Sequence, residues 1–150
     1  MDWEKLDFIK NDGRLFTIAI EDVVYPLCLT VKASELIDKE FGGVQNIGKI
    51  LQDHAEKEEV TAVMQITNKL LSIMIAGGIS RCLTKAKMRG EKIQLPVAPE
   101  SDDLDNVFTY EEMPDIQTLI FSALNGGAKR NVETAPDKSP KNVETATSSN

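Results

Sequence analysis

An apolar stretch from Val60 to Ala76 constrains the fold of this chain more than any other segment. Its large apolar residues recur at three- and four-residue spacing, which is typical of a helix with an apolar stripe. Ile66 and Ile73 lie beside that stripe and widen it, and Lys69 is the only charged residue of the stretch. The pattern therefore predicts a helix that the rest of the protein covers on most sides. The pair Gly77-Gly78 predicts its end, because glycine readily adopts the left-handed conformation of a helix C-cap.

A membrane span is the less favoured interpretation of this stretch. A span needs about 20 mainly apolar residues, whereas Gln65, Asn68 and Lys69 lie in the middle of the segment and two glycines close it. The sequence favours the central helix of a domain that has no membrane contact.

The overall composition is that of a soluble protein with one domain. A chain of 150 residues is long enough to bury a hydrophobic core. Its composition, 41% hydrophobic and 27% charged, is ordinary for a soluble protein. A net charge of -7 disfavours non-specific nucleic-acid binding, which needs cationic side chains against phosphates. Two cysteines, Cys28 and Cys82, and the lack of an N-terminal signal sequence indicate a reducing cytosol. We expect both thiols to fill small apolar sites rather than to form a disulfide.

A β-hairpin is predicted between Arg14 and Val31, where residues alternate with period two around the polar pair Glu21-Asp22. Pro26 lacks a backbone N–H, so the second strand should lie at an edge or be locally irregular. Because a lone hairpin is marginally stable in water, its apolar face should pack on helices. The preceding residues, 1–12, are predicted to form an N-terminal arm, helical or extended, of the kind that often docks on a neighbour.

Further helices are predicted on both sides of the central one. Ser34 should cap the first and Asp115 the last, and Gly42-Gly43 should end the first. Thr109 and Glu112 have the spacing of a capping box. The predicted helical segments are Ser34–Phe41, Val44–His54, Ile79–Arg89 and Ile116–Asn125, with a linker over residues 93–106.

The sequence thus predicts an α+β fold that is mainly α, in which an N-terminal β-hairpin packs on a small helical bundle. Its parts are the arm (1–12), the hairpin and helical domain (13–127) and a disordered, polar C-terminal tail (128–150). Within that tail, Asn131-Val132-Glu133-Thr134-Ala135 recurs as Asn142-Val143-Glu144-Thr145-Ala146, a duplication too short for a repeat architecture.

Charge is distributed in two blocks in the second half of the chain. Five basic residues lie between Ile79 and Lys92, opposed only by Glu91, and the segment from Glu100 to Asp115 holds seven acids and no Lys or Arg. The sequence leaves three alternatives open: the two blocks pair with each other, each block meets a separate partner, or both are solvated surfaces.

Residue patterns that carry catalysis or bind metals and cofactors are missing, so we expect a protein that is not an enzyme and has no cofactor. His54 is the only histidine, and no zinc-ligand spacing, phosphate-binding loop or nucleophile elbow is present. Asp102, Asp103 and Asp105 resemble a calcium loop, but the required glycine and bidentate glutamate are absent.

The last predicted helix has more apolar surface than its own domain needs. Phe121 extends its stripe to about half the circumference, at 100° per residue. The excess predicts a second surface that covers this helix, in a partner or in a homo-oligomer, although a core helix packed only on its own domain remains the alternative. The predicted partner-binding residues are Ile116, Leu119, Ile120, Phe121 and Leu124.

The order of these parts resembles the small tail assembly chaperones of long-tailed bacteriophages and prophages of Gram-positive hosts. The resemblance covers roughly residues 14–130 and is a pattern of elements without an invariant signature. It rests on Phe16-Thr17-Ile18 and Tyr25-Pro26-Leu27 in the hairpin, Glu40-Phe41-Gly42-Gly43, the segment from Val44 to Leu51, the long apolar helix, and Tyr110-Glu111-Glu112 before the last helix.

The resemblance implies a non-enzymatic protein of the host bacterial cytoplasm that is absent from the mature virion. Proteins of this family bind the tape measure protein, keep it soluble and help recruit tail tube subunits, in many phages through a longer, frameshifted form that binds the tail tube protein. The competing hypothesis is a small acidic regulatory adaptor, an inhibitor of a DNA-binding protein whose segment Glu100–Asp115 imitates a phosphate backbone.

Overall fold

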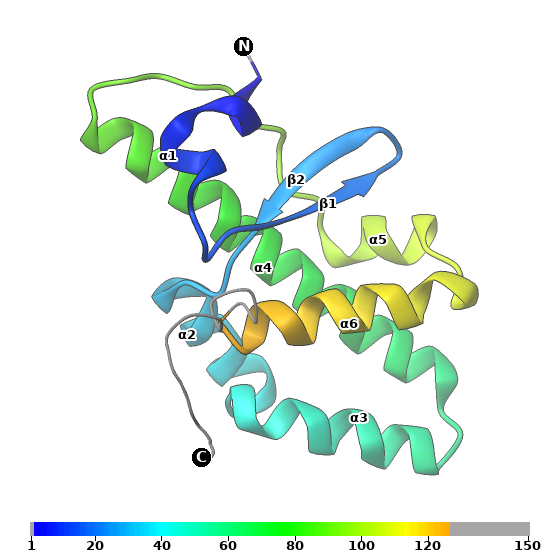
Figure 1. Ribbon diagram of the computed structural model, residues 1–150. Coiled ribbons are helices and arrows are strands. Elements are labelled where there is room, and N and C mark those ends of the chain that lie inside the picture. The colour runs from blue at the N-terminus through cyan, green and yellow to red at the C-terminus, as the bar shows by residue number, and fades with distance from the viewer. Residues whose placement is uncertain (1, 127–150) are drawn as a thin grey trace, which may run out of the picture.

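The computed structural model describes residues 2–126 of the chain (Figure 1). The predicted fold class is confirmed, since an antiparallel two-stranded hairpin packs on a mainly helical domain. The predicted disordered tail, residues 128–150, and its short duplication lie outside the described residues.

Six α-helices and two strands make up the described fold, joined by short 3-10 turns. In chain order the elements are η1 Trp3–Lys5, α1 Asp7–Lys10, β1 Phe16–Ile20, β2 Val23–Leu27, α2 Val31–Phe41, η2 Val44–Asn46, α3 Ile47–Glu56, α4 Val60–Met88, α5 Ser101–Val107, η3 Tyr110–Glu112 and α6 Met113–Leu124.

Helix α4 is the central element, and it does not end where the sequence predicted. It continues through Gly77-Gly78 to Met88. The glycines are required by β2 instead, because a Cβ on Gly78 would lie 2.5 Å from the carbonyl carbon and oxygen of Pro26. A Cβ on Gly77 would lie 2.6 Å from the carbonyl oxygen of Cys28. The prediction of a helix end at Gly77-Gly78 was therefore wrong, since these glycines permit a close helix–strand approach.

The hairpin has the predicted period and turn. Phe16 pairs with Leu27 and Ile20 with Val23, and the two-residue turn Glu21-Asp22 has φ values of 50° and 70°. Positive φ at both central residues is the type I′ geometry, which matches the twist of the strands. As predicted, Pro26 lies in a strand at a sheet edge and the hairpin packs on a helix, here α4.

Helix α2 begins earlier than predicted. Thr30 is its N-cap, and the Thr30 Oγ1 accepts a hydrogen bond from the Ala33 N–H at 3.1 Å. Ser34 lies inside the helix, so its predicted capping role was wrong. The helix ends as expected at Gly42, which has φ of 79° and whose N–H donates to the carbonyl of Asp38.

The acidic region is also more ordered than predicted. Part of the expected linker forms α5, which begins with a capping box between Glu100 and Asp103. The predicted capping box between Thr109 and Glu112 is present in η3, directly before α6. Because that turn leads straight into α6, Asp115 lies in the first turn of the helix and is not its N-cap.

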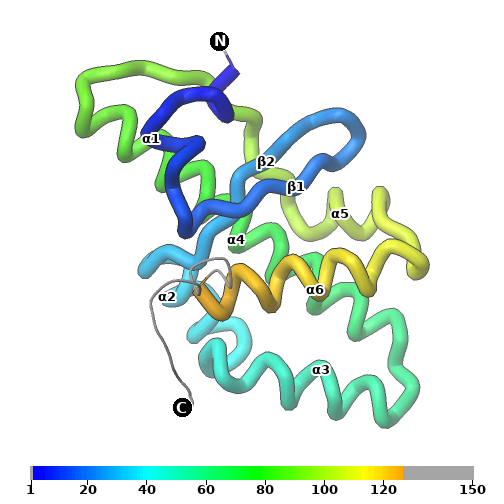
Figure 2. The backbone as a smooth tube through the Cα atoms, in the orientation of Figure 1, coloured from blue at the N-terminus to red at the C-terminus, as the bar shows by residue number. Residues whose placement is uncertain are grey.

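The core has two parts, both built against α4. The larger part is lined by β2 and helices α2 to α6, with Leu27, Ile37, Leu70, Met74 and Ile120 among its fully buried side chains. The smaller part joins the arm to the C-terminal half of α4 and contains Trp3, Ile9, Leu15, Cys28 and Cys82. Figure 2 shows the arm lying along this end of α4, so the described part of the arm docks on its own domain.

By length and composition alone, α4 is also apolar enough to cross a membrane. Within its most apolar window, 44% of the residues are buried inside the described fold. The core helix of a soluble protein passes the same test, so this property is weak evidence for a span.

Candidate partner-binding surface

Helix α6 is held in place at both ends and at its middle. The capping box in η3 and Pro114 in the first turn fix its start. Halfway along, Gln117 Nε2 donates to Thr67 Oγ1 of α4 at 3.1 Å. At its C-terminal end, the Arg14 guanidinium donates to the carbonyl of Gly126 at 3.4 Å. Figure 1 shows α6 crossing α4 between α3 and α5.

The apolar stripe of α6 is divided between the core and the surface. Ile116 and Ile120 are 5% and 1% exposed, so the chain's own domain covers them. Leu119, Phe121 and Leu124 are half-buried at the edge of the core. A partner on the folded surface would reach only these three, and contact with Ile116 or Ile120 would require α6 to move. Partner binding by the five residues remains a prediction.

A shallow hollow lies on the outer side of α6. Its volume is about 570 Å³, and Phe121 is the one large apolar side chain among the residues that line it. The others are Pro114, Gln117, Thr118, Ser122 and Asn125. An apolar side chain of a partner that entered this hollow would therefore rest on Phe121.

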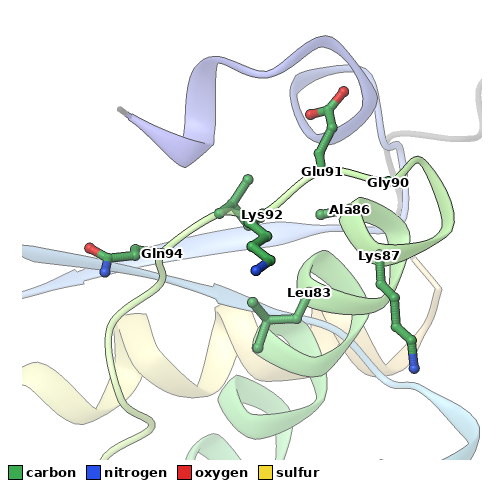
Figure 3. Close-up of a pocket in the computed structure, with 8 residues that line it drawn as sticks. Leu83, Ala86, Lys87, Gly90, Glu91, Lys92 and Gln94 are labelled. Atoms are coloured by element: carbon green, nitrogen blue, oxygen red, sulfur yellow. The ribbon is translucent and has the colours of Figure 1, made fainter.

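A second hollow, at the C-terminal end of α4, was not foreseen from the sequence (Figure 3). It has a volume of about 600 Å³, with Leu83, Ala86 and Ile93 as its apolar residues and Lys87 and Lys92 at its edge. Leu83 is 42% exposed. The sequence holds a signal for this hollow, since apolar residues lie inside the basic block, but only the fold brings Leu83 and Ile93 together.

Three residues of the basic block, Arg81, Lys85 and Arg89, contact the arm. Asp12, whose side chain is 5% exposed, accepts from Arg81 Nε at 2.7 Å and from Lys85 Nζ at 3.0 Å. Burial alone would raise the pKa of Asp12, but the hydrogen bonds from Arg81 and Lys85 outweigh it and hold the pKa well below its usual range. Lys85 also donates to the carbonyl of Phe8 at 2.8 Å, and the Arg89 guanidinium lies 4.4 Å from the centre of the Phe8 ring.

The two charged blocks do not pair with each other within residues 2–126. Arg81 and Lys85 bind Asp12, which belongs to neither block. In the acidic block Asp103 and Glu112 bind backbone N–H groups at helix starts, and Asp105 accepts a hydrogen bond from Asn68 at 2.8 Å. The first of the three alternatives left open by the sequence is therefore wrong for the described chain.

The thiols and the single imidazole form no catalytic arrangement with one another. Cys28 and Cys82 are free and buried, and burial raises the pKa of both, that of Cys82 to about 11. Thiols held protonated in this way are poor nucleophiles. His54 lies at the end of α3 with its Nδ1 2.6 Å from Glu59 Oε1, half exposed to solvent. Among the residues that the structure describes, no group of three or more His, Cys, Asp or Glu side chains is placed to hold a metal ion.

In comparisons with known proteins, no protein-family model, curated protein or solved structure matches this chain significantly.

Proposed function

We propose that this chain is a non-enzymatic tail assembly chaperone of a long-tailed bacteriophage or prophage, which binds and solubilises the tape measure protein and helps recruit tail tube subunits. The protein would act in the host bacterial cytoplasm and be absent from the mature virion. The support is the family resemblance in the order of elements together with the placement of α6. The resemblance runs from the hairpin, through α2 with its Gly42-Gly43 end and the long apolar α4, to an acidic turn before a last helix.

The observation that carries the proposal is the half-buried apolar edge of α6 beside an open hollow. Phe121 lines that hollow, and Leu119 and Leu124 lie on the same helix at the edge of the core. A partner helix binds such a surface through a few apolar anchors, spaced three or four residues apart, that enter a groove. A tape measure protein is long and largely helical, so its apolar helix faces are the chemistry that such a surface would cover.

Co-expression with the tape measure protein tests this proposal. Phe121→Asp should leave the tape measure protein insoluble, because a charge would replace the apolar residue of the hollow. Leu36→Asp is the matched control: Leu36 is 45% exposed on α2, away from the hollow, and this variant should keep the tape measure protein soluble.

Folding must be separated from binding in this experiment, because Phe121 also packs against the core. Phe121→Met keeps an adaptable apolar side chain and should retain solubilisation. Thermal unfolding of each purified variant reports whether the domain is intact. If folded Phe121→Asp solubilises the tape measure protein as well as the unmodified chain, α6 is not the binding surface.

The acidic adaptor is less well supported by the structure. Hydrogen bonding at helix starts and to Asn68 engages four of the seven acids of residues 100–115 and leaves Asp102, Glu111 and Asp115 without hydrogen-bonded side chains in the described fold. The four hydrogen-bonded carboxylates keep their charge but are directed towards the chain's own donors, so only three can adapt to the spacing of a phosphate backbone, which carries one charge about every 1.7 Å of duplex axis. A pull-down that captured a DNA-binding protein instead of a long helical protein would favour this alternative.

A further inference from the structure

We propose that the chain self-associates head to tail, with an acidic corner of one copy seated on a basic hollow of the next. The basic hollow is the one at the C-terminal end of α4, formed by Leu83, Ala86, Lys87, Lys92 and Ile93. The acidic corner is the turn between α5 and α6, formed by Val107, Tyr110, Glu111 and Asp115. This inference goes beyond the proposed function and does not depend on it.

The basic hollow combines an apolar floor with unneutralised cationic groups. Leu83, Ala86 and Ile93 supply the floor, and within residues 2–126 neither Lys87 nor Lys92 makes an ion pair. Figure 3 shows the Lys92 side chain extending towards Leu83, whereas Glu91 points the other way. Such a site fits an apolar or aromatic residue that is flanked by carboxylates.

The acidic corner presents that combination. Tyr110 is 63% exposed and Val107 is 40% exposed, so this corner presents apolar surface to solvent. Glu111 and Asp115 are exposed beside them, and in the described fold neither takes part in the capping boxes that hold α5 and η3. An aromatic residue with free carboxylates is therefore the complement of the basic hollow in both polarity and charge.

The two sites cannot meet within one copy. Helix α5 is attached to the N-terminal third of α4 by the hydrogen bond that Asn68 donates to Asp105. From Asn68 to the hollow at Leu83 and Lys87 the rigid helix extends by about 25 Å, at 1.5 Å per residue. Figure 1 likewise shows the corner and the end of α4 at opposite ends of the molecule. The two surfaces are thus available to each other only between copies.

The symmetry of the contact follows from its chemistry. A hollow on one copy faces a different surface, the corner, on the next, which is a heterologous arrangement that produces open chains or closed rings. Exposed charges steer and align such a contact more than they strengthen it, so association should be weak and should fall with ionic strength.

Sedimentation equilibrium of the full chain over a range of concentrations tests the proposal. At roughly 50 mM salt the average mass should rise above the 16.6 kDa of one chain as concentration increases, and it should return towards one chain at roughly 500 mM. The double reversals Lys87→Glu with Lys92→Glu, and Glu111→Lys with Asp115→Lys, should each weaken association by about tenfold or more.

A charge swap distinguishes direct pairing from damage to the fold. The variant with all four reversals restores opposite charges across the contact and should associate within about threefold of the unmodified chain. This fourfold variant also carries any helix destabilisation that the two double variants cause. Recovery of association therefore cannot come from better folding. Tyr110→Ala should weaken association without changing its dependence on salt.

Three outcomes would overturn the proposal. The unmodified chain could remain at 16.6 kDa at every concentration, the double reversals could leave association unchanged, or the fourfold variant could fail to recover. If the unmodified chain is monomeric and the reversal at Lys87 and Lys92 instead abolishes binding of the tape measure protein, the hollow belongs to that partner and not to a second copy.

Discussion

The close approach of β2 to α4 makes a sharp prediction at Gly78. Gly78→Ala places a Cβ 2.5 Å from the carbonyl carbon and oxygen of Pro26 and 2.6 Å from the Cα of Leu27. Non-bonded carbon atoms prefer separations of about 3.5–4.0 Å, so the strand must move away by about 1 Å. The atoms in the way are backbone atoms, and no flexible side chain can turn aside to relieve the overlap.

Three contributions determine the change in the free energy of unfolding. Alanine favours the helix over glycine by about 1 kcal/mol. Overpacking of this kind costs about 1–3 kcal/mol. Displacing the strand also weakens the hydrogen bond that the Cys28 N–H donates to the carbonyl of Met74 at 3.0 Å, a loss of about 1 kcal/mol. We therefore expect a net destabilisation of about 1–3 kcal/mol, with the thermal midpoint lowered by roughly 3 °C for each kcal/mol.

Gly48→Ala is the matched control. Gly48 lies in α3, and a Cβ there has no atom within 4 Å, so only the helix preference applies and stability should rise by up to about 1 kcal/mol. Urea unfolding with an unchanged slope measures both effects. If Gly78→Ala stabilises the protein as Gly48→Ala does, β2 does not approach α4 as closely as described, and the physical account of the long helix is wrong.

Three further predictions concern the arm, α2 and the buried thiols. Asp12→Asn should destabilise the protein by about 1–2 kcal/mol, since Arg81 and Lys85 are partly exposed and retain some hydration. Because the folded-state pKa of Asp12 is lowered from its ordinary value of 3.8, its stabilisation is fully present above that pH and is lost as the pH falls below it; Asp12→Asn should flatten the acid limb of a stability–pH curve. Thr30→Ala removes the N-cap of α2 and should cost about 1 kcal/mol in urea unfolding, whereas Ser34→Ala should change stability little. A thiol reagent at neutral pH should label Cys82 only in step with unfolding, because burial raises its pKa to about 11; rapid labelling of the folded protein would contradict its placement.

Local chemistry made much of the fold predictable from the sequence. The hairpin followed from period-two alternation around Glu21-Asp22, and the end of α2 followed from a glycine that adopts positive φ. The capping box between Thr109 and Glu112 followed from spacing alone. Each of these features depends on residues within a few positions of one another, so the sequence carries the whole of the relevant interaction.

What the sequence could not predict depends on contacts between distant residues. Gly77-Gly78 has the pattern of a helix end, and only the approach of Pro26 and Cys28 shows why a helix continues through it. Arg81 and Lys85 have the pattern of an exposed basic face until Asp12 is placed beside them. For the candidate partner-binding surface, the apolar width of α6 was visible in the sequence, but how α6 divides between core and surface depends on which side faces α4.

The docked arm has a consequence for synthesis of the protein on the ribosome. Asp12 is made 69 residues before Arg81, its partner in the ion pair. At roughly 5–20 residues per second, about 3–14 s pass between them. During that interval Trp3 and Ile9 have no α4 to pack against, so the growing chain exposes apolar side chains until its middle helix is complete. The N-terminus, although made first, therefore docks only after the central helix α4 has been made.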